Sequence, residues 1–144
     1  MAASGYDRVL ILNVLNSIEP FKGGEAQDLA LVADAVSGRV TVKAGDSLCA
    51  EGEVAETWWV VLDGDAEVTS GGKKIGTIGK NETVGELALF DGAPRSGTVT
   101  AVNDLDVLVF DKSTFIDAIA ASPPLGLALL QSAARRLRAT NALI

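Results

Sequence analysis

In the central half of the chain, apolar residues recur with a period that limits this part of the fold to a few β-sheet architectures. Between residues 39 and 110, short runs alternate apolar and polar residues, and glycine-rich turns such as Asp63-Gly64 and Gly71-Gly72 separate them. A period of two predicts strands, and tight turns at this spacing predict that neighbouring strands are antiparallel. The expected strands are 39–43, 57–62, 66–69, 74–78, 98–102 and 106–110. The pattern therefore predicts an antiparallel β-barrel or jelly roll.

The two ends of the chain follow a helical period instead. Apolar residues recur at helical spacing before Pro20, and Ser122-Pro123-Pro124 has the composition of a helix start. The expected helices are 9–18, 25–36, 113–119 and 125–144. We therefore expect an α+β fold in a single domain, residues 1–144. Its expected parts are N-terminal helices (1–37), a β-barrel (38–111) and C-terminal helices with one long last helix (112–144).

Composition argues against several functional classes. A net charge of −7 does not suit a chain whose task is to hold nucleic-acid phosphates. The chain has no histidine and one cysteine, Cys49, so we expect no metal site, no catalytic residue and no internal disulfide. No apolar run has the length of a membrane span, and no signal peptide is recognisable, so we expect a cytoplasmic protein without a membrane span.

Segment 85–99 carries the clearest sign of ligand chemistry. It includes Arg95, the only basic residue between Asn81 and Asp111. Ser96 and Gly97 follow it and add a hydroxyl and unobstructed backbone N–H groups. A guanidinium beside such donors suits a singly charged phosphodiester.

Two further residues of this segment extend the prediction. Glu86 would repel a phosphate, but its carboxylate suits hydroxyl groups such as those of a ribose. Gly85 allows a backbone to approach a ligand closely. Simpler explanations remain open at this point, because Arg95 could pair with Glu86 and Gly85 could be an ordinary turn residue.

The segment resembles the phosphate-binding cassette of cyclic-nucleotide-binding domains. That cassette runs Gly-Glu-hydrophobic-Ala-Leu, then a short loop, then Pro-Arg-small-small-Thr-Val. The matching residues are Gly85, Glu86, Ala88, Leu89, Pro94, Arg95, Thr98 and Val99. Further counterparts at 44–46, 52–53, 63–65 and 134–138 extend the resemblance from about Glu19 to the C-terminus. The chain departs from the family at Gly97, where alanine is usual, and we expect a looser loop and weaker binding there.

The resemblance implies a role for each cassette residue. Glu86 would hold the ribose 2′-hydroxyl, and Arg95 would pair with the exocyclic phosphate oxygens. The remaining contacts would come from a hydroxyl, a backbone N–H group and two lining residues. The implied ligand-binding residues of the cassette are Gly85, Glu86, Leu87, Arg95, Ser96 and Gly97.

The resemblance also gives the last helix a part in binding. Arg136 and Thr140 occupy positions that would reach the base, and Asn141 a position that reaches it from a neighbouring subunit. The alternative for Arg136 is a solvated helix face with cations near its C-terminal end. Proteins like the catabolite activator continue into a DNA-binding domain where this chain stops, so we expect no direct DNA binding. The last helix would instead support a homodimer or couple to an output domain or protein.

The expected function is a non-catalytic sensor that binds cAMP in preference to cGMP and signals by moving its last helix. In the family a threonine directly after the cassette arginine favours cGMP, and Ser96 has less reach. The alternative is a degenerate pocket in a protein–protein interaction module, against which the presence of both Glu86 and Arg95 argues. Trp58 and Trp59 would face opposite sides of a strand, one in the core and the other either covered by a terminal helix or exposed to a partner.

Overall fold

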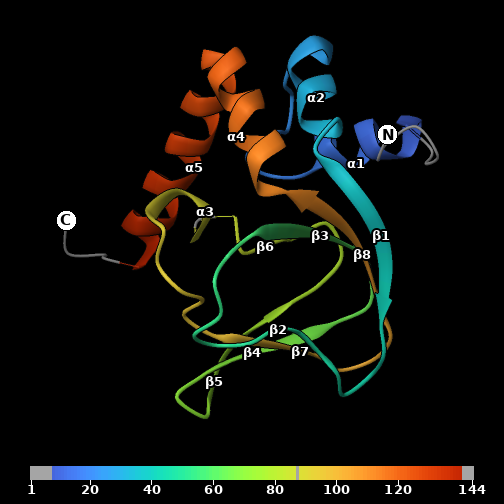
Figure 1. Ribbon diagram of the computed structural model, residues 1–144, viewed down its shortest axis with the longest axis vertical. Coiled ribbons are helices and arrows are strands. Elements are labelled where there is room, and N and C mark those ends of the chain that lie inside the picture. The colour runs from blue at the N-terminus through green and yellow to red at the C-terminus, as the bar shows by residue number, and fades with distance from the viewer. Residues whose placement is uncertain (1–7, 87, 141–144) are drawn as a thin grey trace. The chain divides into compact units, whose positions relative to one another are not determined.

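The computed structural model describes residues 8–86 and 88–140, which divide into two compact units (Figure 1). One unit is the β-rich segment 36–112. The other contains the helices that precede Val36 and those that follow Lys112. The grouping of all three parts in one domain stays a prediction.

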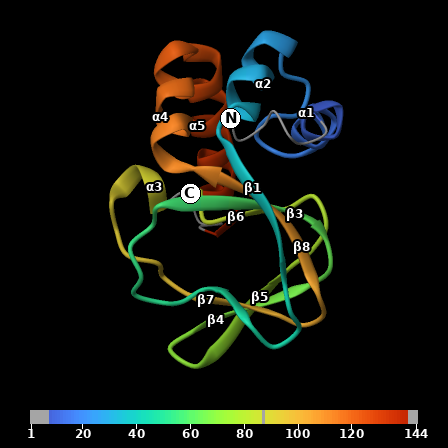
Figure 2. The same cartoon turned by 45° about the vertical axis from the view of Figure 1, so that its right-hand side comes forward.

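The β-rich unit consists of two antiparallel sheets that face each other (Figure 2). One sheet has the strand order β1-β8-β3-β6 and the other the order β2-β7-β4-β5. The elements are β1 (Val36–Val42), β2 (Ser47–Cys49), β3 (Thr57–Asp63), β4 (Ala66–Ser70), β5 (Lys73–Ile78), β6 (Thr83–Val84), α3 (Ala88–Asp91), β7 (Thr98–Ala101) and β8 (Leu105–Asp111). Because the two sheets are separate ladders, the expected barrel takes its jelly-roll form.

The space between the sheets is filled by apolar side chains from both. Strand β8 shows why, because its buried and half-buried residues largely alternate, as a strand with one face in a core requires. The buried cluster consists of Cys49, Trp59, Val61, Ala66, Val84, Val99, Ala101, Leu105 and Val107.

Strand β3 departs from this alternation, since Trp58 to Val61 are all buried. Trp59 belongs to the core cluster and is 8% exposed. Trp58 is fully buried as well, and its ring stacks on Phe110 of β8 with centroids 4.1 Å apart. The alternative of a tryptophan exposed to a partner is therefore wrong.

The boundaries of the elements differ from the expected ones where strand pairing decides them. The second helix ends at Ala33 rather than at residue 36, because Val36 already pairs with Phe110 as the first residue of β1. The strands β2 and β6 are too short to show an alternating pattern and were not predicted.

The helical unit consists of two N-terminal and two C-terminal helices. They are α1 (Arg8–Ser17), α2 (Ala26–Ala33), α4 (Lys112–Ala121) and α5 (Pro123–Thr140). The α1–α2 segment contacts the C-terminal helices through the rings of Phe21 and Phe115, whose centroids lie 6.3 Å apart. Residues 141–144 of the predicted last helix lie outside the described residues.

Among the described residues, no single helix combines the length and the apolarity that crossing a membrane requires. The bent pair α4 and α5 reaches that length and apolarity only when the two helices are taken together, across a bend of 111°.

Candidate functional site: a buried arginine on the cassette

The predicted cassette, residues 85–99, lies in the β-rich unit and extends from the end of β6 into the first two residues of β7. Gly85 follows β6 directly and has a φ of +81°, a left-handed conformation that favours glycine. The backbone of Arg95 is fixed on both sides of its Cα. Its N–H donates to Glu53 O and its carbonyl accepts from Gly52 N, each at 2.8 Å. The loop 50–53 therefore holds the cassette arginine in place.

The side chain of Arg95 turns into the protein and is only 6% exposed. Its Nη1 donates to Gly85 O at 3.0 Å, and its Nη2 donates to Thr57 O. Its Cζ lies 4.8 Å from the centroid of the Trp59 ring. These contacts use two of the five guanidinium N–H groups.

Arg95 makes no ion pair with a carboxylate anywhere in segments 8–86 and 88–140. The simple explanation that Arg95 pairs with Glu86 is therefore wrong, although Glu86 is itself buried, with 3% of its surface exposed. Among the described residues, two carbonyl dipoles and an aromatic face hold this buried positive charge.

Gly85 is more than an ordinary turn residue, because its missing side chain makes room for the guanidinium. A Cβ at this position would come within 2.2 Å of Arg95 Nη1 and 3.5 Å of Trp59 Cζ3. Since any larger residue would occupy the place of the guanidinium, the structure couples the glycine and the arginine of the motif.

Gly97 is also closely packed. It is buried, and a Cβ there would lie 2.8 Å from the carbonyl oxygen of Thr69 in β4. The neighbouring Ser96 has an exposed side chain, and its carbonyl accepts a hydrogen bond from Ser70 Oγ at 2.9 Å. This packing differs from the loose loop expected at Gly97, because the Thr69 carbonyl near the end of β4 leaves the segment little room.

Sequence reasoning missed two residues of this neighbourhood, Trp59 and Cys49. Burial raises the pKa of the Cys49 thiol, and the positive charge of Arg95 partly offsets that rise. Neither residue belongs to the cassette motif, so only the strand pairing that brings β3 and β2 to the cassette could reveal them.

The other predicted residues do not belong to the described part of the β-rich unit. Leu87 lies outside the described residues. Arg136, which is exposed, and Thr140 lie on α5 in the helical unit. Their assignment to the ligand site stays a prediction, and Asn141 lies outside the described residues.

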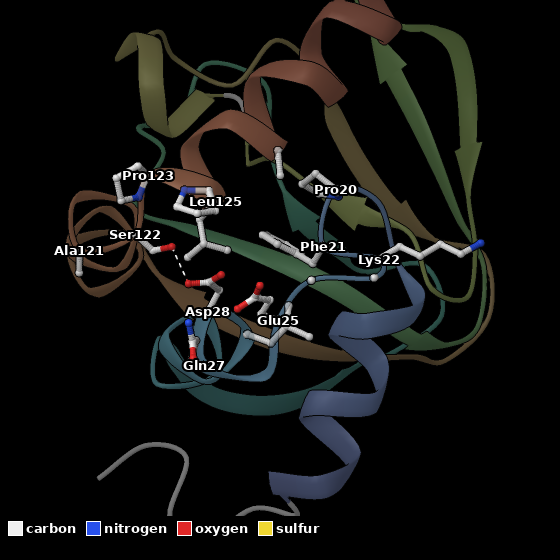
Figure 3. A pocket seen from close by; sticks show the side chains of 15 residues that line it. Pro20, Phe21, Lys22, Glu25, Gln27, Asp28, Ala121, Ser122, Pro123 and Leu125 are labelled. Carbon is white, nitrogen blue, oxygen red and sulfur yellow. Dashed lines mark hydrogen bonds between the residues drawn. The ribbon is translucent and has the colours of Figure 1, made fainter.

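A separate cavity of about 450 Å³ lies within the helical unit (Figure 3). The segment 20–25, the start of α2 and the start of α5 line it. Two of its polar lining residues bond to each other, because Ser122 Oγ donates to Asp28 Oδ1 at 2.7 Å. None of the predicted site residues that the structure describes lines this cavity, and we assign no ligand to it.

A jelly roll that buries a guanidinium with no carboxylate partner in segments 8–86 and 88–140 has the features of a ligand-binding domain. The family model described as the cyclic nucleotide-binding domain matches residues 39–122, more than half of the chain. The chain therefore belongs to the cyclic nucleotide-binding domain family, as the cassette motif predicted.

Two of the similar proteins are regulators. The cAMP-dependent protein kinase regulatory subunit of Eremothecium gossypii is 32% identical over 80% of this chain and 25% of its own length. The CRP-like cAMP-activated global transcriptional regulator of Mycobacterium tuberculosis is 29% identical over 84% of this chain and 56% of its own length. This chain thus spans from a quarter to just over half of these relatives.

A solved structure with the same fold contains the nucleotide. It is the regulatory domain of Toxoplasma gondii PKA in a co-crystal with cAMP, which has a TM-score of 0.70 and 26% sequence identity. The match covers 77% of this chain and 44% of that one. The chain is thus a regulatory-type domain, homologous to proteins that respond to cyclic nucleotides.

Proposed function

We propose that this domain binds a cyclic nucleotide through residues 85–99 and that Arg95 holds its phosphate. The observation that carries the proposal is the burial of the Arg95 guanidinium without a carboxylate partner in the described part of the chain. Moving an ionised group out of water costs several kcal/mol unless an opposite charge compensates. A phosphodiester carries that charge and accepts hydrogen bonds from the N–H groups that the carbonyls leave unused.

The other cassette residues complete the shell of the ligand in this proposal. Glu86 accepts a hydrogen bond from the ribose 2′-hydroxyl, and Ser96 and the Gly97 backbone donate to the phosphate. Gly85 and Leu87 line the phosphate end. The chemistry of these groups supports the assignment, because N–H and O–H donors suit an anion and a carboxylate suits a hydroxyl group.

We expect a preference for cAMP over cGMP. Ser96 stands at the position where, by resemblance, a threonine favours cGMP, and its shorter reach makes a bond to guanine weaker. Relatives of both kinds match the chain, since the two reported above are a cAMP-dependent kinase subunit and a cAMP-activated regulator, and cGMP-dependent protein kinases match as well. The expected preference therefore rests on Ser96.

The output of the domain would be movement of α5. Arg136 and Thr140 would contact the base, so the nucleotide would favour one position of the helix over another. The helix would then act on a second copy of the chain, an output domain or a partner protein. The domain would have no catalytic activity, would not itself bind DNA and would act in the cytoplasm.

Calorimetric titration of cAMP and cGMP into the wild-type protein tests the proposal. Loss of a charge-assisted hydrogen bond costs about 1.5–3 kcal/mol, so Arg95→Ala should weaken cAMP binding by about tenfold or more. The matched control is Arg39→Ala, which removes an exposed arginine from the same unit and should leave affinity unchanged. Absence of binding of either nucleotide to the wild-type protein would favour the alternative of a protein–protein interaction module with a degenerate pocket.

A further inference from the structure

We propose that Trp59 is a positioning residue for the phosphate-binding arginine, its indole face fixing the plane of the Arg95 guanidinium. This inference rests on the proposed function, because the guanidinium is the group that would meet the phosphate. Trp59 lies outside the cassette motif and would make no contact with the phosphate itself.

The position of the Trp59 ring is itself fixed by the sheet. Its backbone pairs with Val109 of β8 on one side and with Val84 of β6 on the other. The side chain is 8% exposed and belongs to the core cluster between the sheets. An indole held in this way provides a rigid surface for a charged group.

Three contacts together define the orientation of the guanidinium. The carbonyl oxygens of Gly85 and Thr57 accept hydrogen bonds from Nη1 and Nη2, and these bonds fix how the guanidinium is turned within its own plane. The Trp59 ring, with its centroid 4.8 Å from Arg95 Cζ, lies against the group as a third support. Without it, the two hydrogen bonds would still allow the plane to tilt, and the remaining N–H groups would lose their common direction.

The electrostatics of the ring also favour this role. The face of an indole carries partial negative charge and attracts a cation most strongly where water is excluded. Arg95 is 6% exposed, so the attraction is little screened. A planar guanidinium stacks on an aromatic face as an ammonium does not, which makes the pair specific to arginine.

The neighbouring Trp58 provides an internal comparison. Its ring lies on the other side of β3 and stacks on Phe110, with an angle of 18° between the ring planes. Both tryptophans are buried aromatic residues on one strand, but within the described part of the chain it is the Trp59 ring that lies against a guanidinium. Loss of a buried indole and loss of the cation–π contact can therefore be separated experimentally.

The test replaces Trp59 with fluorinated tryptophans in a Trp58→Phe protein, where it is the only remaining tryptophan. Fluorine withdraws the negative charge of the ring face with little change in shape. We expect cAMP affinity to fall stepwise with the number of fluorine atoms, by about five- to thirtyfold at full substitution, the range of a desolvated cation–π contact. The matched control is Trp59→Phe, which keeps only Trp58, where fluorination should change affinity less than twofold.

A second readout follows the arginine directly. In NMR spectra the Nε–Hε signal of Arg95 should be displaced by the indole ring current in wild-type protein and in Trp58→Phe. Trp59→Leu should lose that displacement and bind cAMP more weakly, and Trp59→Phe should restore part of both.

The outcomes separate the two proposals. If wild-type protein binds cAMP and its affinity does not depend on fluorination, the positioning role of Trp59 is wrong and the proposed function stands. If wild-type protein binds neither cyclic nucleotide, both fail together. If Trp58→Phe does not fold, fluorinated tryptophan inserted at position 59 alone gives the same comparison.

Discussion

Two arginines of the β-rich unit are held in opposite ways. Arg39 on β1 lies at the surface and donates from Nε and Nη2 to the two carboxylate oxygens of Asp106, at 3.1 and 2.7 Å. Hydrogen bonding to that carboxylate, with its negative charge, raises the pKa of Arg39. Arg95 is buried, and backbone carbonyls and an indole take the place of a carboxylate.

The difference distinguishes a surface ion pair from a binding site. An exposed ion pair contributes about 0–1 kcal/mol to stability, and both of its charged groups belong to the protein. A buried guanidinium without a carboxylate costs free energy that an anionic ligand can recover, so its cost is a sign of binding. The comparison predicts that changes around Arg95 act on nucleotide binding and that matched changes elsewhere act on stability alone.

The largest effect is expected from removal of each arginine in the presence of nucleotide. A ligand that binds only the folded state raises its stability, by about 2.7 kcal/mol at one hundred times the dissociation constant. Saturating cAMP should therefore raise the Tm of wild-type protein and of Arg39→Ala by several degrees. Arg95→Ala should show little or no rise at the same concentration. An equal rise in both variants would remove the distinction between the two arginines.

The next effect separates backbone strain from displacement of the guanidinium. Gly85 and Gly45 both have a positive φ. A Cβ added at Gly85 would clash with the Arg95 guanidinium, whereas a Cβ added at Gly45 would have open space around it. An alanine at either position should lower the free energy of unfolding by about 1–2 kcal/mol. Only Gly85→Ala should also weaken cAMP binding, by several-fold in calorimetry. Unchanged affinity in Gly85→Ala would show that the guanidinium tolerates displacement.

A smaller effect is expected at the position where the chain departs from its family. Gly97→Ala restores the usual residue, yet its Cβ would lie 2.8 Å from Thr69 O, so we expect it to destabilise the fold by about 1 kcal/mol. Gly76→Ala, on β5 with open space around its Cβ, is the control. Urea denaturation of both variants measures the difference. Tighter cAMP binding without loss of stability in Gly97→Ala would support the loose-loop expectation instead.

The smallest effect concerns the thiol beside the buried charge. Burial raises the pKa of Cys49 above its ordinary 9.0, and the charge of Arg95 lowers it in part. Arg95→Ala should therefore raise the pKa of Cys49 further, and Arg39→Ala should not change it, as a titration of the Cys49 ¹³Cβ shift would show. Because the folded pKa is the higher one, this group's contribution to stability is present below the unfolded pKa and is lost as pH rises through the folded pKa. A Cys49 pKa that is the same in both variants would contradict the account.

The sequence predicted those parts of the molecule that depend on local patterns. Period-two runs and glycine turns indicated most strands, and the cassette motif indicated Gly85 and Arg95 together. Pattern could not locate β2 and β6, which have three and two residues. Nor could it show that Val36 leaves the helical pattern to pair with Phe110, because that choice depends on a strand more than seventy residues away.

The role of Trp59 depends in the same way on long-range pairing. Its contact with Arg95 exists because β6 pairs with β3 and brings Gly85 beside the ring. The crowding of Gly97 likewise arises from the Thr69 carbonyl of β4. Neither contact can be predicted from the local sequence, because each joins residues that are far apart along the chain. The residues of the cassette motif lie close together in the sequence, so the motif itself can be recognised.

The most direct test of the central claim is a crystal structure of the domain grown with cAMP. The account predicts a phosphate oxygen about 2.7–2.9 Å from a nitrogen of the Arg95 guanidinium, with the indole of Trp59 still against that group. A bound nucleotide whose phosphate lies out of hydrogen-bonding reach of Arg95 would contradict the claim that this buried charge is the phosphate site.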